Sequence, residues 1–232
     1  MTKSIVLILG SGANVGRSVA RKFAADGYLV AISARSLENG TSPEGYITIK
    51  ADYSHRDAIP IVFDKLKAIA GVPNVVIYNA FSFTRPPPDE LLSIPVGSIE
   101  SDLWVNTFSP LLAAQYAVRG FKELPVIAKK VFIYTGNILN STVLPVPAFF
   151  TLGIGKAASA YWIGSSDLNY SKKGYRFYYA DERTPEGGPV LGNIDAEAHA
   201  DFYKQLVDDH DSSIPWHATF AKGRGYVNFS RI

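Results

Sequence analysis

The stretch "SIVLILGSGANVGRSVA", residues 4–20, decides the fold. Residues 5–10 form a continuous apolar run that ends in glycine, which is typical of a short buried strand. Val15, Val19 and Phe23 then recur at helical spacing. A second apolar run, "LVAISAR" (29–35), follows that helix. This order predicts a strand, a helix and a second strand parallel to the first.

The same alternation continues along the chain. Strands are expected at 46–52, 74–80, 128–136, 174–182 and 223–230, and helices at 57–71, 98–124, 196–210 and around Lys156. Strands that alternate with helices predict a doubly wound parallel sheet between two helical layers, an α/β/α sandwich. We expect one domain over residues 1–232, in which 181–232 supplies the substrate-side segment and the C-terminal strand.

Composition narrows the functional class. The 232 residues are 47% hydrophobic, carry a formal net charge of +2 and include no cysteine. A disulfide framework, a thiolate nucleophile and a cysteine metal site are therefore excluded, and the four histidines lack ligand spacing. The charge gives no reason to expect nucleic acid or anionic membrane as a partner. The N-terminal apolar run is too short to span a membrane, so we expect a cytoplasmic protein without a metal.

The glycine-rich loop "GSGANVG" (10–16) lies where the first strand meets the first helix. Glycines at this point permit a tight turn and let backbone N–H groups approach a pyrophosphate at the helix N-terminus. A plain strand-to-helix turn is the alternative. The cofactor-binding residues predicted here are Gly10, Ser11, Gly12, Asn14, Val15 and Gly16.

Arg35 ends the second strand, where a dinucleotide site meets the adenosine ribose. An arginine without a preceding acidic residue suits a 2′-phosphate, which favours NADP(H) over NAD(H). A solvated surface arginine is the alternative. Asp52 and Tyr53, in "KADYS", are expected near the adenine, although Asp52 is also suited to begin a turn.

Over roughly residues 4–180 these motifs, in this order, resemble the short-chain dehydrogenase/reductase family. "GSGANVG" is similar to the family's Gly-x-x-x-Gly-x-Gly loop, with Asn14 in place of the middle glycine. "YNAF" (78–81) resembles its Asn-Asn-Ala-Gly segment and keeps Asn79 and Ala80. Asn106, in "WVNTFSP", and Lys156, in "GKAASAYWIG", resemble its helix asparagine and its active-site lysine.

The resemblance implies a Rossmann-type fold, with Asn79 and Ala80 in the cofactor wall and Lys156 on the nicotinamide ribose. It also implies a homodimer or homotetramer, because the family commonly associates through the helices that carry Asn106 and Lys156.

The chain departs from the family at the residues that move protons. Leu152 stands where the family has its acid tyrosine, and Gly136 where it has its polarising serine. Phe149 occupies the tyrosine position of the related enoyl reductases, and Asp181 and Glu182 replace an expected Pro-Gly. The predicted catalytic set is therefore Asn106, Lys156 and Thr135, and the other candidate proton sources are Tyr134, Asn137 and Thr151.

Three functions fit this pattern: hydride transfer with a non-standard proton donor, a redox-neutral isomerase, dehydratase or cyclase, and a non-catalytic NADP(H)-dependent binding or regulatory protein. Phe81, Phe83 and the stretch 144–150 predict an apolar pocket wall, although ordinary core packing also explains such residues. The expected substrate is a small apolar or aromatic molecule, such as a carbonyl compound or an enone.

Overall fold

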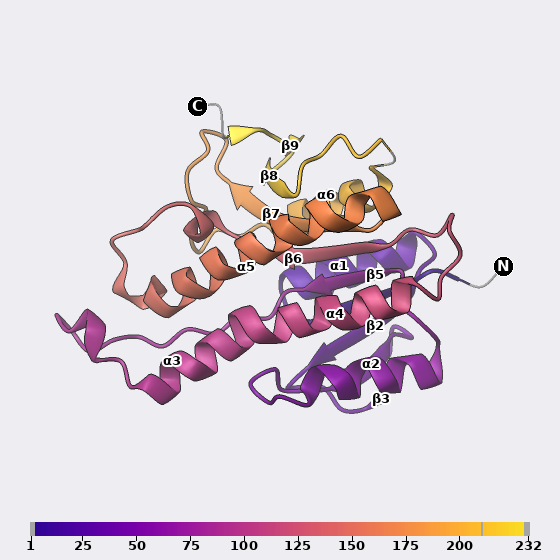
Figure 1. The fold of residues 1–232 in the computed structure, drawn as a ribbon, viewed down its shortest axis with the longest axis horizontal. Coiled ribbons are helices and arrows are strands. Elements are labelled where there is room, and N and C mark those ends of the chain that lie inside the picture. Colours follow the sequence, from indigo (N-terminus) through magenta and orange to yellow (C-terminus); the bar gives the residue numbers. More distant parts are fainter. Residues whose placement is uncertain (1–2, 210, 230–232) are drawn as a thin grey trace.

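The protein is a three-layer α/β/α sandwich built on one mainly parallel sheet (Figure 1). The computed structural model describes residues 3–209 and 211–229. Within them, the strands follow the order β3-β4-β2-β1-β5-β6-β7-β8-β9. The strands are β1 (Ile5–Leu9), β2 (Leu29–Ala34), β3 (Gly40–Thr41), β4 (Ile47–Lys50), β5 (Val75–Tyr78), β6 (Val131–Thr135), β7 (Arg176–Arg183), β8 (His217–Ala221) and β9 (Gly225–Tyr226).

Two helical layers cover the sheet, and each buries its own apolar cluster. One face packs against α2 (Ala58–Ile69), α4 (Ser109–Phe121) and α5 (Phe150–Tyr170). The other face packs against α1 (Val15–Ala25) and α6 (Ala196–Asp208). The predicted fold class, a single doubly wound α/β domain, is confirmed.

The helix predicted at 98–124 is longer at its start and irregular in its middle. It begins as α3 (Val96–Leu103), passes through the π-helical turn Trp104–Phe108 and continues as α4. The wider turn carries Asn106, which has no exposed surface.

The C-terminal third differs most from prediction. The parallel strand β8 was not predicted, and neither was the short strand β3. The strand predicted at 223–230 contains only β9, which pairs antiparallel with β8, while Ser230 lies outside the described residues. The helix predicted at 196–210 ends at Asp208, and His210 also lies outside the described residues.

The chain reverses its winding direction between β1 and β5. From β1 it proceeds outward through β2 and β4, then returns to pair β5 on the other side of β1. In open α/β sheets such a reversal leaves a crevice beyond the carboxyl ends of the strands. The crevice here lies between Gly10 after β1 and Asn79 after β5.

Candidate functional site

A cavity of about 810 Å³ occupies this crevice and continues across the ends of β6 and β7. Its walls include most of the predicted cofactor residues, namely Gly10, Ser11, Gly12, Asn14, Val15, Arg35, Asp52, Tyr53, Asn79, Ala80 and Lys156. Thr135 also lines it. The predicted residues Gly16 and Asn106 do not line it.

Backbone packing fixes the glycine loop. Gly10 has φ +91°, and a Cβ there would overlap the backbone of Ala80. Asn79 holds the loop from the other side, since its Nδ2 donates to the Gly10 carbonyl at 2.9 Å. Gly16 lies inside the turn, where a Cβ would sit 2.6 Å from Ser11 Cα. Gly16 therefore closes the loop from behind and does not face the cavity.

The loop presents an open cradle to the cavity. A Cβ added at Gly12 would meet nothing within 4 Å. Asn14 caps α1 without a side-chain hydrogen bond, and the first turn contains no acidic residue. The N–H groups of Gly10, Ser11 and Gly12 donate to backbone carbonyls. The open space at Gly12 and the positive end of the α1 dipole are therefore the features that suit an anion such as a pyrophosphate.

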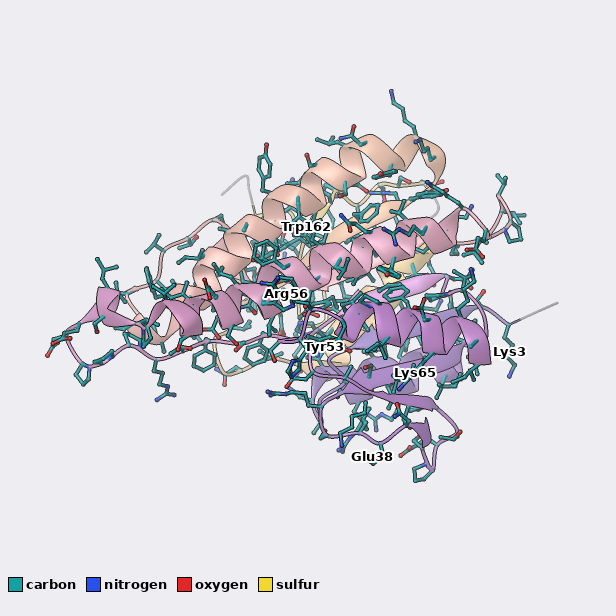
Figure 2. The ribbon with its side chains drawn as sticks, turned by 60° about the horizontal axis from the view of Figure 1, so that its bottom comes forward. Lys3, Glu38, Tyr53, Arg56, Lys65 and Trp162 are labelled. Carbon is teal, nitrogen blue, oxygen red and sulfur yellow. The ribbon has the colours of Figure 1, made fainter. Side chains whose placement is uncertain are left out.

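Arg35 and Asp52 lie together at the far end of the cavity. Arg35 is exposed, as a group that binds a phosphate from solvent must be. Burial opposes ionisation of Asp52, but hydrogen bonds from Ser54 outweigh it, and the pKa of Asp52 is lowered. Tyr53 also lines the cavity, and its hydroxyl is buried. Arg56 reaches toward the helix formed by α3 and α4 (Figure 2), with its guanidinium carbon 5.0 Å from the centroid of the Trp104 ring.

Lys156 is buried at the centre of the cavity wall, which excludes a surface lysine lying along an amphipathic helix. The residue is 5% exposed, and its Nζ donates to the Thr135 carbonyl at 2.6 Å. The same Nζ lies 4.3 Å from the centroid of the Tyr134 ring. Burial lowers the pKa of Lys156 to about 7, although Asp181 acts in the opposite direction. Within the described part of the chain the ammonium thus has one oxygen partner, and it borders the cavity with further donors available.

Asn106 positions another segment of the wall. Its side-chain amide pairs with both backbone groups of Ser82, by Nδ2 to the carbonyl at 2.6 Å and Oδ1 to the N–H at 3.0 Å. Its own carbonyl accepts from the hydroxyls of Tyr134 and Ser159. Asn106 therefore holds the segment that carries Phe81 and Phe83, which line the cavity.

Two of the candidate proton sources are committed elsewhere. The Tyr134 hydroxyl donates to the Asn106 carbonyl at 2.9 Å. The Thr151 hydroxyl donates to Asp102 at 2.8 Å and has no exposed surface. Leu152, which the sequence predicts at the acid position, lines the cavity. The α5 side of the cavity thus offers an apolar contact at this residue.

The Thr135 hydroxyl is engaged from the opposite face of the sheet. Its Oγ1 accepts from the Tyr203 hydroxyl of α6 at 2.7 Å, whereas Lys156 belongs to α5. Only the Thr135 carbonyl contacts Lys156. Its hydroxyl is held by α6, on the other face of the sheet from Lys156 and α5.

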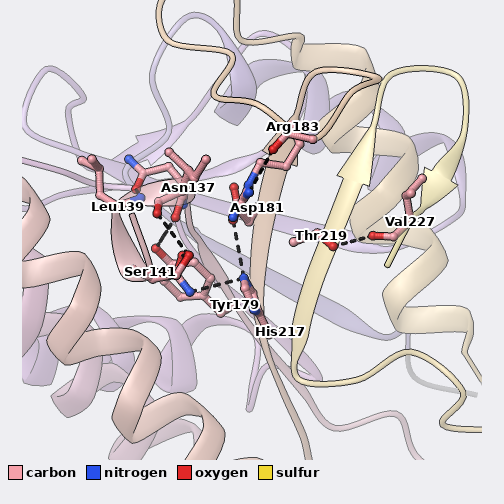
Figure 3. Close-up of polar contacts among 12 residues, drawn as sticks. Asn137, Leu139, Ser141, Tyr179, Asp181, Arg183, His217, Thr219 and Val227 are labelled. Carbon is pink, nitrogen blue, oxygen red and sulfur yellow. Dashed lines mark hydrogen bonds and ion pairs between the residues drawn. The ribbon is translucent and has the colours of Figure 1, made fainter. Parts of the chain in front are cut away.

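Tyr179 occupies the space beside Gly136, and a Cβ at Gly136 would overlap its ring. The Tyr179 hydroxyl accepts from the Asn137 N–H at 3.1 Å and donates to the Asn137 carbonyl at 2.8 Å (Figure 3). A serine at position 136 is therefore incompatible with Tyr179 as it lies here.

Sequence reasoning missed a polar pair in the same cavity. Glu182 and His199 both line it, and His199 Nδ1 lies 3.5 Å from a Glu182 carboxylate oxygen. Burial raises the pKa of Glu182 to about 7 and lowers that of His199 to about 4. The replacement of Pro-Gly by Asp181 and Glu182 was the available signal. Asp181 itself pairs with Arg183 and His217 on β7 and β8 (Figure 3).

Within residues 3–209 and 211–229, no group of at least three histidine, aspartate or glutamate side chains is arranged to hold a metal. None of the helices in these residues combines the length and apolarity needed to cross a membrane.

Comparison with known proteins identifies relatives of this chain by sequence and by structure. No family model matches the chain. It is 39% identical over 243 residues to the short chain dehydrogenase/reductase dmxR12 of Cryptosporiopsis sp. (strain 8999), covering 99% of this chain and 96% of that protein.

Solved structures agree in fold. A metagenomic short-chain oxidoreductase in complex with NADP has a TM-score of 0.79 at 17% identity, over 95% of this chain and 97% of that one. A short chain dehydrogenase from Burkholderia cenocepacia J2315 in complex with NADP has a TM-score of 0.76 at 20% identity, over 95% and 96%. With the glycine loop, the buried lysine and the sheet order all in place, the relationship to dmxR12 shows that the chain belongs to the short-chain dehydrogenase/reductase family.

Proposed function

We propose that the protein binds NADP(H) in this cavity and reduces a small apolar or aromatic carbonyl compound or enone. The observation that carries the proposal is that one continuous cavity is lined by Arg35, the glycine loop, Lys156 and an apolar wall. A cofactor site and a substrate site are thus joined, as hydride transfer requires.

The donor set suits NADP(H). Arg35 would bind the 2′-phosphate, the cradle at Gly12 the pyrophosphate, and Lys156 the hydroxyls of the nicotinamide ribose. The two structural neighbours described above were crystallised with NADP, which supports the same cofactor here. NAD(H) is the less favoured cofactor because no acidic residue accompanies Arg35 at the end of β2.

The substrate would lie against the apolar part of the wall. Phe81 and Phe83 stack on each other with ring centroids 6.3 Å apart, and both border the cavity. Leu144, Phe149 and Leu152 face it from the α5 side. The segment 189–194 and Glu182 close it from the C-terminal part of the chain, which supports a substrate-side role for that region.

Proton delivery would differ from that of family members with a tyrosine. When bound, the cofactor supplies the hydride. The reaction also consumes one proton. In a ketone, hydride adds to the carbonyl carbon and the proton converts the carbonyl oxygen into a hydroxyl; in an enone, hydride adds to the β-carbon and the proton to the α-carbon. Leu152 has no proton to give, and the hydroxyls of Tyr134 and Thr151 are already donated to protein acceptors. We propose that water supplies the proton.

The test is NADPH oxidation by purified protein with apolar ketones, aromatic ketones and enones, after NADPH binding has been established. Oxidation that requires one of these compounds, with formation of the alcohol or the saturated ketone, would support the proposal. Binding of NADPH with no oxidation across the set would favour the redox-neutral or non-catalytic functions instead. No NADPH binding would exclude both NADPH-dependent hydride transfer and the non-catalytic NADP(H)-dependent function.

A further inference from the structure

Asn137 is one of the polar residues that line the cavity, and it lies beside apolar lining residues. It follows Gly136, and it borders the cavity together with Leu139 and Leu152. The side chain is half-buried. It therefore lies within the part of the cavity that the proposed function assigns to the substrate.

Its backbone is held by a single side chain. The Tyr179 hydroxyl accepts from the Asn137 N–H and donates to the Asn137 carbonyl (Figure 3). Tyr179 is itself fully buried and stacks on Tyr134 with ring centroids 5.6 Å apart. Tyr179, whose ring excludes a serine at position 136, thus also fixes the backbone of Asn137.

The side-chain amide is oriented as well. Asn137 Oδ1 accepts from the Leu139 N–H at 3.1 Å, which caps the short turn Ile138–Asn140. An N–H needs an acceptor, so the oxygen must face Leu139 and the NH₂ group must face away from it. Among the described residues, Nδ2 is the one polar atom of Asn137 with no hydrogen-bond partner. It is also absent from the fully buried unpaired atoms, so it has accessible surface.

We propose that Asn137 Nδ2 donates a hydrogen bond to the carbonyl oxygen of the substrate. This inference rests on the proposed function for its substrate class. An amide N–H fixed in advance costs little reorganisation, and it opposes the negative charge that builds on the oxygen during reduction. The substrate class that follows is an aromatic or apolar molecule with one carbonyl acceptor at the Asn137 end.

Asn137→Asp is the informative variant. The aspartate keeps the shape of the side chain and an acceptor for Leu139, but it replaces the NH₂ donor with an oxygen. Asn140→Asp is the matched control, since Asn140 ends the same turn, does not line the cavity and gains the same charge. Thermal melts of both variants check the fold.

The probes are 2-acetylnaphthalene and 2-ethylnaphthalene, which differ chiefly in the carbonyl oxygen. Each is titrated calorimetrically into the protein with NADP⁺ and without it, so that no turnover occurs. We expect Asn137→Asp to lower the preference for the ketone, measured as the ratio of the two Kd values, by about three- to tenfold, the effect of one lost hydrogen bond. Asn140→Asp should leave the ratio unchanged.

A nuclear magnetic resonance measurement on the unmodified protein keeps the inference testable if Asn137→Asp does not fold. The side-chain NH₂ resonance of Asn137 should shift with the ketone and not with the hydrocarbon. An unchanged ratio in Asn137→Asp, an equal change in Asn140→Asp, or failure of both probes to bind would overturn the inference. Failure of NADP⁺ to bind would instead overturn the proposed function, and the ratio without cofactor would still decide the role of Asn137.

Discussion

At the scale of single residues, Lys156 is a cation buried in the cavity wall, where we expect it to contact the cofactor. Burial lowers its pKa to about 7, from 10.5 in an unfolded chain. Between pH 7 and pH 10.5, Lys156 is protonated in the unfolded chain and deprotonated in the folded protein. The free energy of unfolding must therefore rise with pH in this window, whereas below pH 7 the buried charge persists and its cost is constant.

Lys156→Met tests this linkage in the cofactor-free protein, because methionine preserves the packing of the stem without the charge. The stability of the parent relative to the variant should increase between pH 7 and pH 9, with a slope approaching about 1.4 kcal/mol per pH unit. Urea unfolding of both proteins at several pH values measures this difference, in which the titration of other groups cancels. A difference independent of pH would mean that Lys156 is not desolvated.

Sequence predicted the place of Lys156 but not its partners. The partners are the carbonyl of Thr135 and the ring of Tyr134, which β6 brings to α5 from about twenty residues away. Reasoning from side-chain types cannot predict that a backbone carbonyl will accept a hydrogen bond from this lysine. The same limit hid Tyr179, whose ring lies beside Gly136 only because β6 and β7 pair in one particular register.

At the scale of elements, the π-helical turn between α3 and α4 holds the segment 81–83, which lines the cavity, against the helical layer. Asn106 pairs with both backbone groups of Ser82, and Asp102 accepts from the Ser82 hydroxyl at 2.6 Å. Asn106→Ala would leave a partly buried N–H and a partly buried carbonyl of that segment without their side-chain partner. We expect the free energy of unfolding to fall by about 2–3 kcal/mol.

Hydrogen exchange at the Ser82 amide should accelerate in the same variant, because the segment loses its anchor. Asn169→Ala is the control, since Asn169 is exposed and donates to a carbonyl within α5 at 2.7 Å, and its change should stay within about 0.5 kcal/mol. Equal losses in the two variants would argue against a specific clamp at Ser82.

The elements that sequence did predict are those with a local signal. The run at β1, the glycine loop and the helical spacing of α1 all lie within one short segment. Strand β8 reads "HATFA", and its histidine and threonine break the apolar run that would mark a buried strand. It forms because β7 offers an unpaired edge, to which Tyr179 and His217 align.

At the scale of the whole molecule, the surface of α4 and α5 carries apolar side chains. Tyr161 is 81% exposed and Leu168 is 73% exposed on α5. Ala157 and Ala158 are exposed one turn before Tyr161, so a second copy could approach closely. We propose a homodimer through this face, as the family resemblance implies.

Tyr161→Glu should convert the dimer to a monomer, because it places a charge in the middle of the apolar contact. Light scattering coupled to size exclusion measures the mass. Val126→Glu is the control, since Val126 is 97% exposed in the loop between α4 and β6. A monomeric parent protein, or a dimer that survives Tyr161→Glu, would contradict the assignment of this face.

Calorimetric titration of NADPH and NADH into the parent protein and into Arg35→Ala tests the central claim most directly. The claim is that the cavity at the ends of the strands is an NADP(H) site, with Arg35 on the 2′-phosphate. The parent should bind NADPH more tightly than NADH, and Arg35→Ala should weaken NADPH binding by about 1.5–3 kcal/mol while leaving NADH nearly unchanged. Equal losses for the two cofactors, or no binding of NADPH by the parent, would contradict it.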